Sequence, residues 1–256
     1  MKLKGVVTLR KVILVIHGMR TGQLNETLLR FTHSLFEGTQ LDYDIAFLES
    51  ETRDLNHCIK QSIDQGYRRI QIVPLLLFTA SHYFEDIIEM KTEWQSRYPN
   101  IHFQLAKPLG THDKMETWVR AQIENYQAII DDNTAIVVLA HGNKRFEEPD
   151  NALKRISNHL TKLDYACFSA MVYGDLNFKA TLPPLARRFQ RILVIPYFFY
   201  DGFLVNRTKR QIEAMQLSSD IVFTSAINFH PILKDVILAR IHELEEASNV
   251  SDTTQS

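Results

Sequence analysis

Several features that would mark other classes of protein are scarce or missing in this 256-residue sequence. Its two cysteines, Cys58 and Cys167, are far apart and form no CxxC motif, which argues against a disulfide framework or a thiolate zinc site. No apolar run approaches the length of a membrane span, and the stretch at 12–16 is too short for a signal peptide. The formal net charge of −1 gives no global field that would attract nucleic acid or a membrane. We therefore expect a cytoplasmic protein that binds neither.

Sequence motifs for nucleotides and for serine hydrolases are also missing. Gly18 and Gly142 each follow an apolar run, but neither extends into GxGxxG or GxxxxGK[ST]. Ser81 has no GxSxG context. We therefore expect no organic cofactor.

The sequence does contain one pattern twice. Three landmarks occur in the same order in each half of the chain: VILVIHG at 12–18 and IVVLAHG at 136–142, RIQIVPLLLF at 69–78 and RILVIPYFFY at 191–200, and LGTH at 109–112 and INFH at 227–230. The offsets between equivalent positions are 124, 122 and 118. A nearly constant offset over three landmarks indicates two copies of one module.

Each module predicts an α/β fold. Continuous apolar runs bounded by turn residues are typical of buried parallel strands, and helical patterns lie between them. We expect strands near 11–16, 42–48, 69–77 and 101–106, then near 134–140, 166–172, 190–198 and 220–225, with helices such as 24–36, 55–65, 84–97 and 116–129. The architecture is thus two homologous three-layer modules, each a mostly parallel four-stranded sheet flanked by helices. Their expected limits are 1–131 and 132–247, followed by a disordered polar tail at 248–256.

The polar residues that directly follow strands are the candidates for function, because ligands of such sheets lie at the carboxyl ends of the strands. In the first module these residues are His17, Glu49 and His82. Two imidazoles and a carboxylate suit divalent Fe, Co, Ni or Zn, and imidazole also accepts protons near neutral pH. A single histidine could equally cap or brace a loop, so it is the pair that indicates a metal site. The second module keeps His141 but has Leu204 where the offset places His82, which predicts one metal site in the chain.

Two further groups of side chains stand out. His112 and His230 lie where helices begin, so capping or a surface role is the better interpretation. Basic residues on or just after the strand-end loops would together form a rim suited to a polycarboxylate ligand: Arg20, Arg53, Lys144, Arg145, Arg207, Lys209 and Arg210.

Three strings resemble those of the sirohydrochlorin chelatases: HGMR at 17–20, FLE at 47–49, and VPLLLFTASH at 73–82 with DI at 86–87. The chain is most similar to the long, two-module type, sirohydrochlorin ferrochelatase and its cobaltochelatase relatives, from about residue 11 to about residue 244. The string PLLLFTAxH is the most specific part. The resemblance implies a class II chelatase-like fold and insertion of a divalent metal into sirohydrochlorin to form sirohaem. The metal is a substrate, Fe²⁺ foremost, with Co²⁺ or Ni²⁺ as alternatives.

The resemblance also implies roles for matching residues. His17 and His82, aided by Glu49, would handle the metal and the pyrrole protons. Residues expected to contact the substrate are Arg20, Arg53, Ser81, His141, Arg145 and Arg207. Met19 stands where the family usually has serine, which bears on the choice of metal. Two fused modules supply an interface within one chain, so a monomer is expected.

Two alternatives remain open at this point. One is a tetrapyrrole or metal carrier that binds without turnover, for which Met19 would mark a changed site. The other is a two-domain binding protein of the periplasmic type, against which the short join near 131–133 and the missing signal sequence count.

Overall fold

A computed structural model describes residues 9–18, 23–79 and 81–253 of the chain. The chain forms two compact units, of which the first contains residues 1–110 and 233–256 and the second contains residues 111–232. The chain therefore passes from the first unit to the second after Gly110 and returns after Ile232. No helix in the described ranges is long and apolar enough to cross a membrane.

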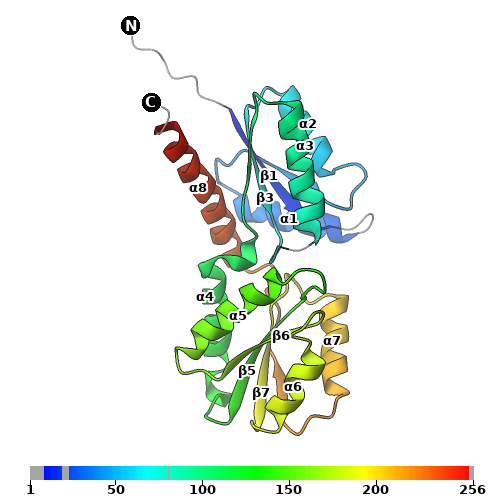
Figure 1. The fold of residues 1–256 in the computed structure, drawn as a ribbon, viewed down its shortest axis with the longest axis vertical. Coiled ribbons are helices and arrows are strands. Elements are labelled where there is room, and N and C mark those ends of the chain that lie inside the picture. Colours follow the sequence, from blue (N-terminus) through cyan, green and yellow to red (C-terminus); the bar gives the residue numbers. More distant parts are fainter. Residues whose placement is uncertain (1–8, 19–22, 80, 254–256) are drawn as a thin grey trace. The chain divides into compact units, whose positions relative to one another are not determined.

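The first unit is a parallel four-stranded sheet with helices on both faces (Figure 1). Its elements are β1 (Arg10–Ile16), α1 (Gln23–Phe36), β2 (Tyr43–Phe47), α2 (Leu55–Asp64), β3 (Arg69–Pro74), the π-helical η1 (His82–Ile88), α3 (Glu89–Arg97), β4 (His102–Leu105), the 3₁₀ turn η2 (Leu109–Thr111) and α8 (Ile232–Thr253). The strand order is β2-β1-β3-β4. Alternate residues of the strands, such as Ile13, Val15, Ile70 and Ile72, pack in one cluster with α2 and α3.

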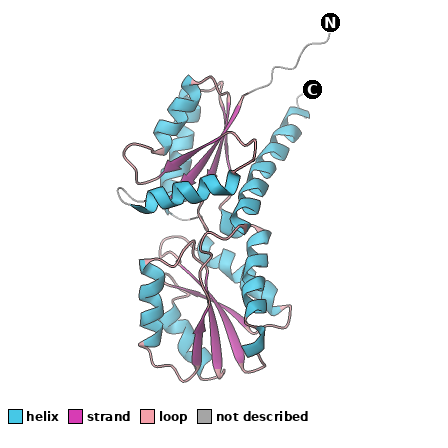
Figure 2. Ribbon diagram, turned by 180° about the vertical axis from the view of Figure 1, so that it is seen from behind, coloured by secondary structure: helices cyan, strands magenta, loops and turns pink. Residues whose placement is uncertain are grey.

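The second unit repeats this plan, with strand order β6-β5-β7-β8. Its elements are α4 (Asp113–Asn125), the 3₁₀ turn η3 (Gln127–Ile129), β5 (Thr134–Ala140), α5 (Glu148–Thr161), β6 (Cys167–Met171), α6 (Phe178–Ala186), β7 (Arg191–Pro196), α7 (Phe203–Glu213) and β8 (Asp220–Phe223). Figure 2 shows the strands of each unit sandwiched between helices. The predicted α/β class, the eight strands and the two parallel sheets are thus confirmed.

The compact units do not coincide with the predicted modules 1–131 and 132–247. Helix α4 ends the first sequence repeat but belongs to the second unit, and α8 ends the second repeat but belongs to the first unit. Each repeat therefore gives its last helix to the unit built by the other repeat. Strand periodicity locates the repeats, but it carries no information about which sheet a following helix covers.

The expected disordered tail at 248–256 is corrected for residues 248–253, because α8 continues to Thr253, and residues 254–256 lie outside the described residues. The side chain of Ser248 is buried, and its hydroxyl lies 2.8 Å from the amide nitrogen of Gln104 on β4. The same amide nitrogen donates to the carbonyl of Leu244, at 2.6 Å. A polar composition suggested a solvated segment, but here the polar groups find partners inside the first unit.

Helix α8 covers one face of the first sheet with a regular apolar stripe. Leu233, Val236, Ile237 and Ile241 are buried, at the i, i+3, i+4 and i+8 spacing of one helix face. Arg240 lies on the same face and donates a hydrogen bond to the carbonyl of Pro108, at 2.8 Å.

Candidate metal-handling site

The predicted site lies at the carboxyl edge of the first sheet. His17 follows β1, Glu49 follows β2, and His82 begins η1 shortly after β3. Because β1 pairs in parallel with both β2 and β3, the ends of these three strands meet at one edge. The fold therefore brings together residues that are up to 65 positions apart in the sequence.

The two histidines of the first unit are in direct contact. Their Nε2 atoms are 2.9 Å apart, and the rings meet edge to face with centroids 4.4 Å apart. Two nitrogens that bind one metal ion at about 2.1 Å and at a right angle lie about 3.0 Å apart. The two side chains are therefore as close as predicted, at a separation that suits a shared metal ion, and metal binding by the pair stays a prediction.

The outer nitrogen of each ring is held by an acceptor. The Nδ1 of His17 is 3.0 Å from the carbonyl oxygen of Gly18, and the Nδ1 of His82 is 2.7 Å from a carboxylate oxygen of Asp86. Since a carbonyl or a carboxylate accepts, each Nδ1 carries the hydrogen and each Nε2 is left with a lone pair. Two facing lone pairs at 2.9 Å suit a cation between them, either a proton or a metal ion.

Asp86 was not among the predicted site residues. The signal that would have found it is its position four residues after His82, which places both side chains on one face of a helical turn. That turn is π-helical, a form that occurs mostly as short segments and frequently at functional sites. Tyr83 and Ile87 are buried on the inner side of the same turn, and the hydroxyl of Tyr83 donates to the carbonyl of Ala106, at 3.2 Å.

Glu49 lies beside the pair rather than inside it. One of its carboxylate oxygens is 3.7 Å from the Nε2 of His17, at the outer limit of an ion pair. The side chains of His17, His82, Glu49 and Asp86 are each 42–46% exposed, so an ion or a ligand can reach all four. Among the described residues, no group of three histidine, cysteine or acidic side chains forms a ready-made metal site.

Gly18 allows the close approach of β1 and β2 that places His17. Its φ angle is +67°, and a Cβ atom at this position would lie 2.6 Å from the ring of Phe47 on β2. Any other residue would strain the backbone at this position and displace the ring of Phe47, two residues before Glu49.

The second unit retains one half of this arrangement. The Nδ1 of His141 lies 2.7 Å from the carbonyl oxygen of Gly142, as in the first unit, and its ring packs beside Tyr173. Leu204 stands where the first unit has His82 and packs against the core of the second unit. The predicted loss of the second histidine is therefore also seen in the fold.

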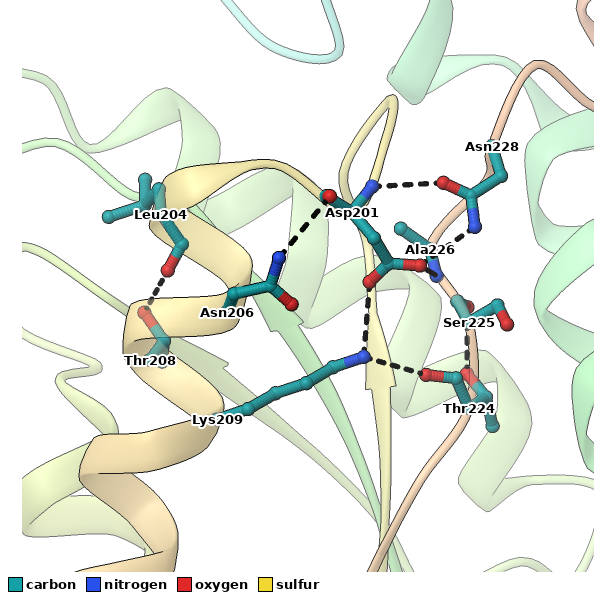
Figure 3. A network of polar contacts seen from close by, with 9 residues as sticks. All are labelled: Asp201, Leu204, Asn206, Thr208, Lys209, Thr224, Ser225, Ala226 and Asn228. Atoms are coloured by element: carbon teal, nitrogen blue, oxygen red, sulfur yellow. Dashed lines mark hydrogen bonds and ion pairs between the residues drawn. The ribbon is translucent and has the colours of Figure 1, made fainter.

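A network of polar contacts stands near the missing histidine instead (Figure 3). The carboxylate of Asp201 accepts from Lys209, at 3.0 Å, and from the side chain of Asn228, at 2.7 Å. It also accepts from the backbone amide of Ala226, at 3.1 Å. No sequence pattern indicates this network, because the partners of Asp201 are 8, 25 and 27 positions away.

The predicted substrate-binding residues are distributed over both units. Ser81 and Arg53 belong to the first unit, where the Nε of Arg53 donates to the carbonyl of Ile45, at 2.8 Å. Arg145 and Arg207 are exposed in the second unit, and Arg145 lies over the ring of Phe146. Arg20, and Met19 beside it, lie outside the described residues.

His112, His230 and the two cysteines behave as the sequence indicated. His112 and His230 accept from the backbone amides two residues further on, each at 3.1 Å, and so cap α4 and α8. Burial raises the pKa of Cys58 to about 11 and that of Cys167 to about 12, which disfavours the thiolate that would bind a metal.

Comparisons with known proteins agree with this fold. The CbiX family model matches residues 11–126 and again residues 135–244. Sirohydrochlorin ferrochelatase of Bacillus subtilis is 27% identical over 211 residues, 78% of each chain. From Priestia megaterium, a sirohydrochlorin ferrochelatase is 25% identical, covering 91% of this chain and 90% of that one, and a sirohydrochlorin cobaltochelatase is 24% identical, covering 92% and 80%.

A solved structure has the same fold. SirB from Bacillus subtilis with Fe3+ superimposes with a TM-score of 0.80 at 23% identity, covering 94% of this chain and 97% of that one. The family model matches both repeats and covers most of the chain. The chain therefore belongs to the CbiX family.

Proposed function

We propose that this protein inserts a divalent metal ion, Fe²⁺, into sirohydrochlorin, as the names of its ferrochelatase relatives suggest. The observation that carries the proposal is the His17–His82 pair, whose two Nε2 lone pairs face each other at 2.9 Å. Such a pair holds either a metal ion or a proton, which are the two species that a chelatase exchanges.

The proposed exchange balances one metal ion against two protons. The macrocycle gives up two pyrrole N–H protons and takes up one divalent ion. When the ion leaves the pair for the ring, the lone pairs of His17 and His82 become free to accept a proton. Two protons cannot both remain on rings 2.9 Å apart, so the second passes to Glu49, 3.7 Å from His17, and then to solvent.

Asp86 and the carbonyl of Gly18 keep the pair ready for this exchange. Each hydrogen bond fixes the hydrogen on Nδ1, so the lone pair on Nε2 points toward the reaction centre. The second unit has one histidine at the equivalent place and is assigned to substrate binding. The substrate contacts predicted for Arg20, Arg53, Ser81, His141 and Arg145 belong to the same proposal.

Anaerobic metallation of sirohydrochlorin, followed by its absorption spectrum, tests the proposal with Fe²⁺, Co²⁺ and Ni²⁺ in parallel. We expect catalytic turnover, fastest with Fe²⁺. Faster turnover with Co²⁺ or Ni²⁺ would identify that ion as the preferred metal and would leave the proposed reaction unchanged. Stoichiometric binding of sirohydrochlorin without acceleration of metal insertion would identify a carrier instead of an enzyme.

We also propose that the protein acts as a monomer, because both units and the site of the first one come from a single chain. Light scattering during size-exclusion chromatography measures this directly.

A further inference from the structure

An amphipathic face of α7 is exposed at the carboxyl edge of the second sheet. Phe203, the first residue of the helix, is 76% exposed. Arg207 and Arg210 are also exposed, and their i+4 and i+7 spacing places them on the same face as Phe203. Within the described ranges neither guanidinium makes an ion pair or a side-chain hydrogen bond.

The loop that presents this face is held firmly in place. Lys209, on the opposite side of the first turns of α7, pairs with Asp201 in the loop before the helix (Figure 3). Both side chains are mostly buried, with exposed fractions of 22% and 27%. The side chain of Asn228 makes two further hydrogen bonds with Asp201. Its amide nitrogen donates to the carboxylate of Asp201, at 2.7 Å, and its amide oxygen accepts from the backbone amide of Asp201, at 2.9 Å. The exposed side chain of Phe203 thus directly follows a loop that an ion pair and several hydrogen bonds hold in place.

The backbone on the far side of this network is strained. Asn228 and Phe229 are consecutive non-glycine residues with φ angles of +45° and +60°. Such conformations persist only where the surroundings impose them, and they concentrate at functional sites. Here the ring of Phe229 stacks on that of Tyr200, with centroids 6.0 Å apart, and Tyr200 in turn packs against Gly202, directly before Phe203.

The first unit uses the equivalent helix start for its metal chemistry. By the repeat offset of 122, Leu204 corresponds to His82, Phe203 to Ser81 and Arg207 to Glu85. One copy therefore presents imidazole and carboxylate at this place, and the other presents an aromatic ring followed by two arginines whose guanidiniums pair with none of the described residues.

Resting on the proposed function, we propose that Phe203, Arg207 and Arg210 form a docking face for the acidic tetrapyrrole. The ring of Phe203 stacks on the flat apolar macrocycle, and the two guanidiniums pair with carboxylates at its periphery. The occupant follows from complementarity, because an aromatic surface flanked by free cations fits a flat apolar molecule fringed with negative charge.

Equilibrium binding of metal-free sirohydrochlorin to the full chain tests the face, with protein fluorescence as the readout. We expect Phe203→Ala to raise Kd about fivefold and Arg207→Ala to raise it about threefold. The control is Arg155→Ala, which removes an exposed arginine on α5 of the same unit and should leave Kd unchanged. Circular dichroism and thermal unfolding check that each variant is folded.

A second ligand separates the two contributions. For a porphyrin with two carboxylates, Phe203→Ala should weaken binding as it does for sirohydrochlorin. Arg207→Ala and Arg210→Ala should weaken the binding of this porphyrin less than they weaken the binding of sirohydrochlorin. The slope of Kd against ionic strength should also fall in the two arginine variants.

The outcomes distinguish this inference from the proposed function. A wild-type chain that metallates sirohydrochlorin, with Kd unchanged in all three variants, overturns the docking face alone. A chain that binds through this face but does not accelerate metallation overturns the proposed activity alone. If Phe203→Ala instead converts a dimer to a monomer at unchanged Kd, the face is a self-association surface and the inference is wrong.

Discussion

At the residue scale, the proposed chemistry of the first unit depends on two nitrogen atoms 2.9 Å apart. Each has a different supporting group, the carbonyl of Gly18 for His17 and the carboxylate of Asp86 for His82. Neither histidine can substitute for the other, because each contributes one lone pair to a site that needs both.

We predict that His17→Ala and His82→Ala each lower kcat for metallation by about 100-fold or more, the usual effect of losing a positioned acid–base group. His141→Ala is the matched control, since it has the same histidine–glycine hydrogen bond but no partner imidazole. It should retain activity within about threefold. Anaerobic initial rates measure all three, and equal losses would show that the second unit shares the chemistry.

Glu49→Gln tests the proposed route for the second proton. Glutamine has the size of glutamate but cannot take up a proton near neutral pH, so we expect kcat to fall about tenfold with little change in KM. A rise in KM at constant kcat would instead place Glu49 among the groups that bind the substrate. Initial rates over a range of sirohydrochlorin concentrations separate the two effects.

The sequence was sufficient to bring His17, Glu49 and His82 to one edge of the sheet. His17 directly follows a buried strand, Glu49 and His82 come shortly after the next two, and parallel strands align their carboxyl ends. It was insufficient for Asp86, since a carboxylate four residues into a helix usually faces solvent. It was also insufficient for the partners of Asp201, which come from the helix before β8 and from the loop after it. Contacts made across loops leave no periodic pattern.

At the scale of elements, the strands were the predictable part, because short continuous runs of valine, isoleucine and leucine are typical of buried strands. The segment 84–97 was predicted as one helix, and the structure has the π-helical η1 followed by α3. Apolar spacing alone does not distinguish a π-helical turn from an α-helical one over so few residues.

Ser248 provides a test of how α8 is attached to the first sheet. Its buried hydroxyl bonds to Gln104 and also to the carbonyl of Leu244 four residues earlier. We predict that Ser248→Ala lowers the free energy of unfolding by about 1 kcal/mol. Ser96→Ala removes the same kind of bond, from a hydroxyl to the carbonyl four residues earlier, at an exposed site on α3. Ser96→Ala should change the free energy of unfolding little, as measured by urea denaturation. Similar losses of unfolding free energy in both variants would mean that the Gln104 contact contributes nothing to stability.

The Asp201 network predicts a pH dependence of stability. Burial raises the pKa of Asp201, but hydrogen bonds from Asn228, Lys209 and the amide of Ala226 outweigh it, so the pKa lies below its usual value. A carboxyl group of this kind stabilises the fold above its unfolded pKa of about 4 and loses that contribution as pH falls through the folded pKa.

Asp201→Asn should therefore lower the unfolding free energy by about 1–2 kcal/mol at pH 7, and the difference from wild type should shrink below pH 4. Urea denaturation at a series of pH values measures this, with the exposed Asp132→Asn as control. A difference that is constant down to acid pH would mean that the ionised form of Asp201 contributes nothing.

At the scale of the whole molecule, the exchange of α4 and α8 decides which fragments of the chain contain all the helices and strands of one unit. Residues 111–232 form one contiguous unit, with Trp118 and Val119 of α4 buried in it. We predict that fragment 111–232 folds alone with a cooperative transition. Fragment 132–256, which follows the sequence repeat, lacks α4 and carries α8 without its sheet, so it should be less stable and aggregate. Circular dichroism melts and size-exclusion profiles compare the two, and the opposite ranking would show that the repeats are the folding units.

The exchanged helices also set an order of events during synthesis. The first 110 residues leave the ribosome without the helix that covers one face of their sheet, and α8 follows only after all 122 residues of the second unit, 111–232, have been made. At about 5–20 residues per second, this delay is roughly 6–24 s. The second unit can fold during that interval, whereas the first must wait for α8 to complete the cover of its sheet. The half of the protein that is synthesised first therefore completes its fold last.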